Sequence, residues 1–213
     1  MRAALLGAAL LSATASPAPA QTAPGAFDFY LLALSWSPGF CAAGGDSRAP
    51  AQCAAGSGLG FVVHGLWPQF ARGFPSDCAG AARSPSRQAV SSADGLYPDE
   101  GLARHEWRVH GTCSGLSPTD YYAAARRARA AVTIPEPFKA PRQAQTWAPL
   151  DVARTFAAAN PGLRVDEMAV TCRNGDLEEV RICFAKDLGG FVPCPQVARA
   201  SCRAPAMVVP PLR

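Results

Sequence analysis

The chain contains three histidines, and all of them lie in two short segments. His64 begins the segment HGLWPQ, and His105 and His110 both belong to the segment HEWRVHGTCSG. Histidine has an unperturbed pKa of about 6.5, so both of its protonation states are available near neutral pH. A pair of histidines can therefore serve as a general acid and a general base. This clustering predicts acid–base chemistry.

A carboxylate accompanies the second pair of histidines. We expect a helix over residues 102–110 that stops at Gly111. On such a helix His105, Glu106 and His110 fall at about 0°, 100° and 140°, on one face. Glu106 and His110 are then an i, i+4 pair, close enough to interact. We expect this carboxylate to raise the pKa of the imidazole and to help orient it.

The alternative chemistries fit the spacing less well. A zinc protease helix carries His-Glu-x-x-His, whereas this chain has one residue more between its histidines. None of the eight cysteines forms a Cys-x-x-Cys pair, which argues against a structural zinc site. A cysteine nucleophile is equally weak, because we expect every cysteine to be paired. We therefore expect neither a metal nor a cofactor.

The start of the chain is typical of an exported protein. Residues 1–20 combine Arg2, a short apolar run over residues 3–11 and a small-residue cleavage site at Ala18-Pro19-Ala20, although a cut after Ala15 also fits. An even number of cysteines behind such a signal indicates disulfides formed in an oxidising compartment. We expect a secreted or periplasmic protein without a membrane span. The formal net charge of +4 does not by itself indicate nucleic-acid binding.

The remaining patterns predict one α+β domain over residues 21–213. Strands are expected over residues 27–36 and 60–64. The first should end at Ser37-Pro38-Gly39 and be followed by a loop that runs to Gly58, and the second should be closed by Gly65 and Pro68. Helices are expected over residues 118–131 and 149–159 as well as 102–110. Residues 168–172 and 177–184 are expected to form a hairpin around Asn174-Gly175. The sum is a mainly antiparallel sheet packed against helices and held by disulfides.

The two histidine segments resemble the signature segments of the ribonuclease T(2) family, in its bacterial, secreted or periplasmic form. LLALSWSPGFC, GLSPTDYY and the VRIC region resemble further parts of the same family, so that the resemblance covers nearly all of the mature chain. It implies a metal-independent endoribonuclease. Such an enzyme cleaves single-stranded RNA by attack of the 2′-hydroxyl and leaves a 2′,3′-cyclic phosphate.

The resemblance also implies roles for particular residues. His64 would protonate the leaving 5′-oxygen, His110 would take the proton of the 2′-hydroxyl, and Glu106 would support both. The expected substrate-binding residues are His105 at the phosphate, Trp67 stacked on a base, Gln69 and Arg108. The expected disulfides are Cys41–Cys53, Cys78–Cys113, Cys172–Cys202 and Cys183–Cys194.

Two departures from the family pattern leave questions open. Val109 stands where the helix segment of the family usually has lysine, so catalytic power is in doubt, and we expect a lysine there to raise turnover unless Arg108 compensates. Gln69 stands where an acidic residue is often found, so base preference is open. An inactive RNA-binding relative is the alternative function. We expect a monomer whose partner is RNA.

Overall fold

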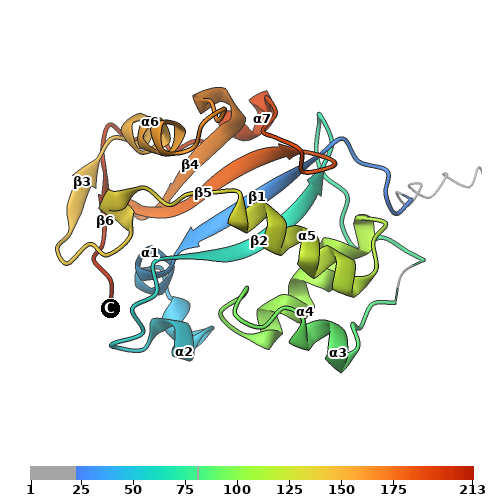
Figure 1. The fold of residues 1–213 in the computed structure, drawn as a ribbon. Coiled ribbons are helices and arrows are strands. Elements are labelled where there is room, and N and C mark those ends of the chain that lie inside the picture. Colours follow the sequence, from blue (N-terminus) through green and yellow to red (C-terminus); the bar gives the residue numbers. More distant parts are fainter. Residues whose placement is uncertain (1–22, 81) are drawn as a thin grey trace, which may run out of the picture.

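The structure, a computed structural model, describes residues 23–80 and 82–213, and the predicted signal peptide lies outside them. A six-stranded sheet forms the centre of the molecule (Figure 1). Its order is β2-β1-β5-β6-β3, with β4 also paired to β5, and the main pairings are antiparallel. The predicted fold class is therefore confirmed. The strands are β1 Phe29–Trp36, β2 Phe61–Gln69, β3 Gln145–Trp147, β4 Met168–Arg173, β5 Asp176–Ala185 and β6 Met207–Val209.

The three long predicted helices are present with ends shifted by at most two residues. In α5 the Ser117 side chain accepts a hydrogen bond from the backbone N–H of Asp120, as expected for an N-cap. The described residues include no helix that is both long and apolar enough to cross a membrane. The helices are α1 Ser37–Ala42, α2 Pro50–Cys53, α3 Arg87–Ser91, α4 Glu100–Val109, α5 Pro118–Ala130, α6 Pro149–Ala159 and α7 Pro195–Ala198.

The two faces of the sheet have different surroundings. Leu32, Leu34 and Trp36 of β1 are fully buried in the main core, together with residues of α3 to α6. Because side chains alternate along a strand, Ala33 and Ser35 point to the opposite face. There a smaller apolar cluster includes Cys183 of β5 and Val197 of α7. The rest of that face is available for a site.

Two predictions about β2 and the segment after β1 are wrong. The strand does not close at Gly65 but continues to Gln69, paired with β1 along its length. Pro68 has no N–H to donate, and it is tolerated because β2 is at the edge of the sheet. Residues 37–58, expected to be a loop, contain α1 and α2. The extension matters because it brings His64 and Trp67 onto one strand.

Long-range contacts fix α4 against this strand. Tyr121 of α5 donates a hydrogen bond to the Leu66 carbonyl at 2.9 Å, and Tyr122 donates to the Ala103 carbonyl at 2.9 Å. The backbone N–H of Asp77 donates to the Val109 carbonyl at 2.8 Å, which holds the end of α4. The disulfides are Cys41–Cys53, Cys78–Cys113, Cys172–Cys202 and Cys183–Cys194, the pairs that the resemblance implies.

Candidate active site

His64 lies on an irregularity of β2. Leu34 of β1 pairs with Val63, and its neighbour Ala33 pairs with Gly65, so His64 is the extra residue of a β-bulge. The bulge breaks the alternation of the strand. As a result His64 and Gly65 lie on the same face as Trp67, away from the main core.

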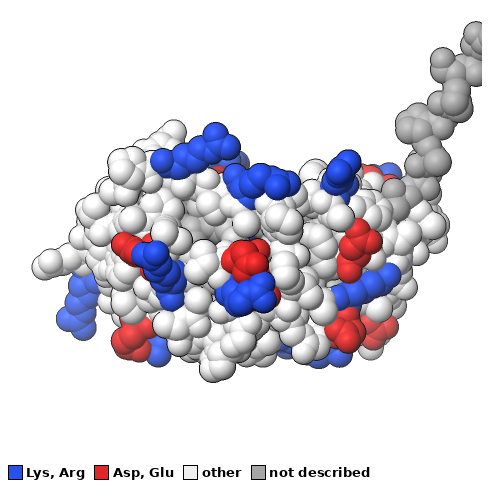
Figure 2. Space-filling view, turned by 90° about the horizontal axis from the view of Figure 1, so that it is seen from above, with Lys and Arg blue, Asp and Glu red and all other residues white. Residues whose placement is uncertain are grey.

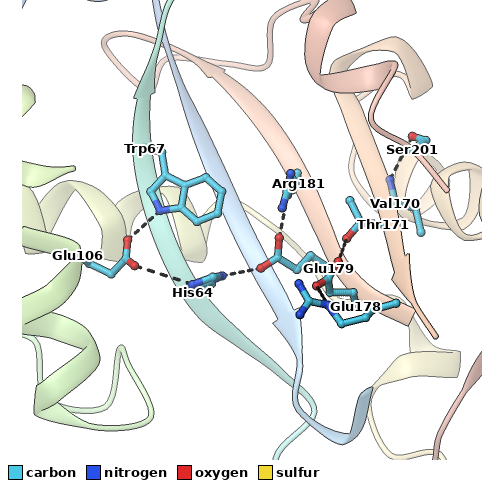
Figure 3. Close-up of polar contacts among 10 residues, drawn as sticks. His64, Trp67, Glu106, Val170, Thr171, Glu178, Glu179, Arg181 and Ser201 are labelled. Carbon is cyan, nitrogen blue, oxygen red and sulfur yellow. Dashed lines mark hydrogen bonds and ion pairs between the residues drawn. The ribbon is translucent and has the colours of Figure 1, made fainter. Parts of the chain in front are cut away.

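Two buried carboxylates flank the His64 ring (Figure 3). Its Nδ1 is 2.5 Å from Oε1 of Glu179, and its Nε2 is 3.9 Å from Oε1 of Glu106. Burial on its own would lower the pKa of His64, but the hydrogen bond and charge of Glu179 and the charge of Glu106 outweigh it and raise the pKa. The Glu179 contact also fixes which nitrogen is turned away from β5, since it occupies Nδ1. When the ring is protonated, its second proton is therefore at Nε2.

Glu106 reaches the site from α4 through a gap that only glycine leaves. A Cβ atom on Gly65 would lie 2.0 Å from Oε2 of Glu106 and 2.1 Å from Nε1 of Trp67. In that space the Trp67 indole donates a hydrogen bond to Oε2 of Glu106 at 2.7 Å. Burial raises the pKa of Glu106 to about 7, against the opposing charge of His64 and the Trp67 hydrogen bond. Glu106 is thus a buried group with access to both protonation states.

His110 differs from His64 in having no carboxylate that offsets the effect of burial on its pKa. It is the C-cap of α4, with φ −114° and ψ −46°, and its Nδ1 is buried with no hydrogen-bond partner among the described residues. Burial, followed by the nearby His105 and His64, lowers the pKa of His110 to about 3. The expectation that Glu106 raises this pKa is wrong, because the Glu106 carboxylate turns to Trp67 and His64 instead.

Two cavities lie next to each other here, since His64 and Glu179 of one contact Trp67 and Arg181 of the other. One, of about 630 Å³, is lined by His64, His105 and Glu179. The other, of about 430 Å³, is lined by Trp67 and His110 among others. The Trp67 ring centre is 5.2 Å from the centres of both the His64 and the His110 ring. The Trp67 ring is therefore close to both histidine rings and links them.

The expected substrate-binding residues are not all at the cavities. His105 is exposed and lines the first cavity, and its Nδ1 is 3.4 Å from a guanidinium nitrogen of Arg108. Arg108 and Val109 line neither of the two. Gln69 lines the second cavity, although it is mostly buried and its amide donates to the Pro68 carbonyl at 2.9 Å. The predicted single helix face therefore divides between the two cavities.

Glu179 and Arg181 are two residues of the site that were not predicted from the sequence. Both lie on β5, and their register partners on β1 are Ser35 and Ala33, so they share the face of His64. Nε of Arg181 donates to Oε2 of Glu179 at 2.7 Å (Figure 3). The available signal was the alternation of the strand, in which these charged residues oppose the buried Val180 and Ile182.

The arrangement defines a class of protein: an α+β fold with two histidines of opposite proton affinity at the meeting point of two open cavities. Residues 27–194 match the ribonuclease T2 family. A ribonuclease of Aeromonas hydrophila is 38% identical over 194 residues, which cover 89% of this chain and 86% of that protein. The chain belongs to the ribonuclease T2 family and is an endoribonuclease.

Solved structures show the same fold. The RNase-related protein from Calystegia sepium superposes with a TM-score of 0.65 at 22% identity, over 88% of this chain and 98% of that one. RNase NT in complex with 5′-AMP has a TM-score of 0.58 at 20% identity, over 87% of this chain and 99% of that one. These likenesses extend the comparison to nearly the whole of the described chain.

Proposed function

We propose that this ribonuclease cleaves single-stranded RNA by transesterification, with His110 as general base and His64 as general acid. His110 takes the proton from the 2′-hydroxyl, the 2′-oxygen attacks phosphorus, and the bond from phosphorus to the 5′-oxygen breaks. His64 gives its proton to that oxygen. The products are a 2′,3′-cyclic phosphate and a free 5′-hydroxyl, and the reaction needs no metal.

The opposite pKa shifts of the two histidines carry this assignment. A base must be neutral before it can accept a proton, and an acid must be protonated before it can give one. Environments that push two pKa values apart assign these roles. Burial lowers the pKa of His110 to about 3, which favours its neutral form, whereas the charges of Glu179 and Glu106 raise the pKa of His64 against the effect of burial and favour its protonated form. Glu106, within 3.9 Å of His64, supports it.

The substrate would lie across both cavities, with the scissile phosphate near the Trp67 ring. Trp67 is half-buried, and we propose that its accessible part stacks on a base in the second cavity, beside Gln69. His105 would contact the phosphate from the first cavity. Its proximity to Arg108 gives that arginine an indirect role, through the orientation of His105.

We further propose that the enzyme acts as a monomer outside the cytoplasm, after removal of residues 1–20. Four disulfides within the described fold support the location outside the cytoplasm, because such bonds form and persist in oxidising compartments.

The requirement for the 2′-hydroxyl tests the mechanism directly. An RNA oligonucleotide is expected to be cleaved in excess chelator, while the same sequence in DNA, or with 2′-O-methyl at one step, is expected to stay intact at the modified positions. Mass spectrometry of the early products should find the cyclic phosphate. Cleavage of DNA, or activity that a chelator abolishes and zinc restores, would contradict the proposal.

The pKa shifts predict an acid-shifted pH profile of kcat/KM. Activity requires neutral His110, so it falls as the pH drops through the lowered pKa of about 3. It also requires protonated His64, so it falls as the pH rises through the raised pKa. We expect a plateau in mildly acidic solution and a decline on the alkaline side, measured on a dinucleotide from pH 3 to 9. An acid limb near the unperturbed value of about 6.5 would contradict the lowered pKa of His110.

A further inference from the structure

A cation on β5 lies beside the two histidines but belongs to neither signature segment. Ala33 of β1 has Gly65 as its partner on one side and Arg181 on the other, so the three form a row across the sheet. Two strand spacings, about 10 Å, therefore separate the backbones of Arg181 and Gly65. The long side chain of Arg181 closes part of this distance, and its guanidinium carbon lies 5.5 Å from the centre of the Trp67 ring.

A buried carboxylate holds Arg181 in this position. Oε2 of Glu179 accepts from Nε of Arg181 at 2.7 Å, while Oε1 of the same carboxylate contacts Nδ1 of His64. Glu179 is only 4% exposed, so its two partners are fixed relative to each other. Within residues 23–80 and 82–213, the two terminal nitrogens of Arg181 make no hydrogen bond. They remain able to donate to a ligand.

Few positive charges near Arg181 are placed to attract a phosphate. Arg181 lines the cavity of His110, and among the described residues that line this cavity no other is a lysine or arginine. The buried carboxylate of Glu179 lies close to the same place and would repel an anion. On the face shown in Figure 2, basic side chains lie singly or next to acidic ones rather than in one stripe. Among the described residues, Arg181 is therefore the lysine or arginine that the cavity of His110 can offer to a phosphate.

We propose that Arg181 contacts the substrate, with its terminal nitrogens donating to the non-bridging oxygens of the scissile phosphate. A guanidinium offers parallel donors that match two such oxygens, and a preorganised charge stabilises the negative charge that grows there during attack. Glu179 is then a positioning residue that holds the side chains of both His64 and Arg181 in place. This inference rests on the proposed function. Val109 stands where the family usually has lysine, and Arg181 would supply the positive charge that such a lysine would have given to the site.

Arg181→Met tests the proposal, because methionine keeps much of the length and loses the charge. On a defined dinucleotide at pH 5 we expect kcat to fall about 10²-fold, as for the loss of one preorganised donor. The affinity for inorganic phosphate, measured by calorimetry, should weaken about tenfold, as for one charge-assisted hydrogen bond. Arg181→Lys should recover part of both. Arg164→Met is the matched control, since Arg164 also pairs with a buried carboxylate, Glu167, but lines neither cavity, and it should leave both values within about twofold.

The outcomes separate contact with substrate from an indirect role. Unchanged kcat and phosphate affinity in Arg181→Met would overturn the proposal. So would a variant that binds phosphate normally and loses activity only because the His64 titration, followed by NMR, has moved, since Arg181 would then act through Glu179 alone. If the wild type cleaves no RNA, the proposed function fails, whereas a charge-dependent loss of phosphate binding would still support contact between Arg181 and an anion.

Discussion

His110→Ala is expected to lower kcat on RNA by about 10³-fold while the protein stays folded. The imidazole is the only group we propose as acceptor for the 2′-hydroxyl proton, and a positioned base or acid contributes about 10² to 10⁴ in rate. His64→Ala should cause a loss of similar size, because the 5′-oxygen would then leave without a proton. The rates are measured in the steady state on a dinucleotide, with thermal unfolding followed in parallel.

The double variant is the informative control for this pair. Residues that act as one catalytic unit are strongly non-additive, so removal of both histidines should cost little more than removal of one. The unfolding temperature should not fall for His110→Ala, since the ring has a buried nitrogen without a partner among the described residues. If His110→Ala retained a tenth or more of the wild-type rate, the base would have to be another group.

Gly65→Ala is expected to lower kcat about 10²-fold, although it adds only one methyl group. The new atom would stand 2.0 Å from the Glu106 carboxylate and 2.1 Å from the Trp67 indole nitrogen, so both side chains must move. Their mutual hydrogen bond breaks, and Glu106 moves away from His64. A displacement of about 1 Å in an active site costs about this factor. The unpaired buried carboxylate should also destabilise the fold by about 1–3 kcal/mol.

Gly190→Ala is the matched control for this substitution. No atom lies within 4 Å of a Cβ placed there, so activity and unfolding temperature should stay at wild-type values. Tryptophan fluorescence would report the displaced Trp67 in Gly65→Ala. A Gly65→Ala enzyme within about twofold of the wild-type kcat would show that the close approach of Glu106 is not needed for catalysis.

Sequence patterns predicted those helices and turns well that are determined by residues close together in the chain. The Ser117 cap, the Asn174-Gly175 turn and the helix before Gly111 depend on neighbours in the chain, and the structure contains all three. The histidines could be chosen from their residue type and their segments alone. What failed was the end of β2, because Gly65 and Pro68 are ordinary strand terminators unless an edge position tolerates them.

The electrostatic partners of the histidines could not be predicted in the same way. Helix spacing predicted that Glu106 would act on His110. Its carboxylate instead occupies the space beside Gly65 of β2, where a Cβ atom would otherwise lie. Glu179 joins His64 only because β1 pairs with both β2 and β5, which are more than 100 residues apart. Alternation places charges on a face, but the order of strands decides which charges meet.

The bulge at His64 costs the sheet stability but places the imidazole in the site. An extra residue leaves the ladder between β1 and β2 locally broken, and regular pairing would restore it. A chain shortened by one residue at this point could regain that pairing, yet it would have no imidazole where the two cavities meet. Selection for a firmer sheet and selection for a working enzyme therefore act in opposite directions on this strand, as is typical where a fold departs from its own regularity at a functional site.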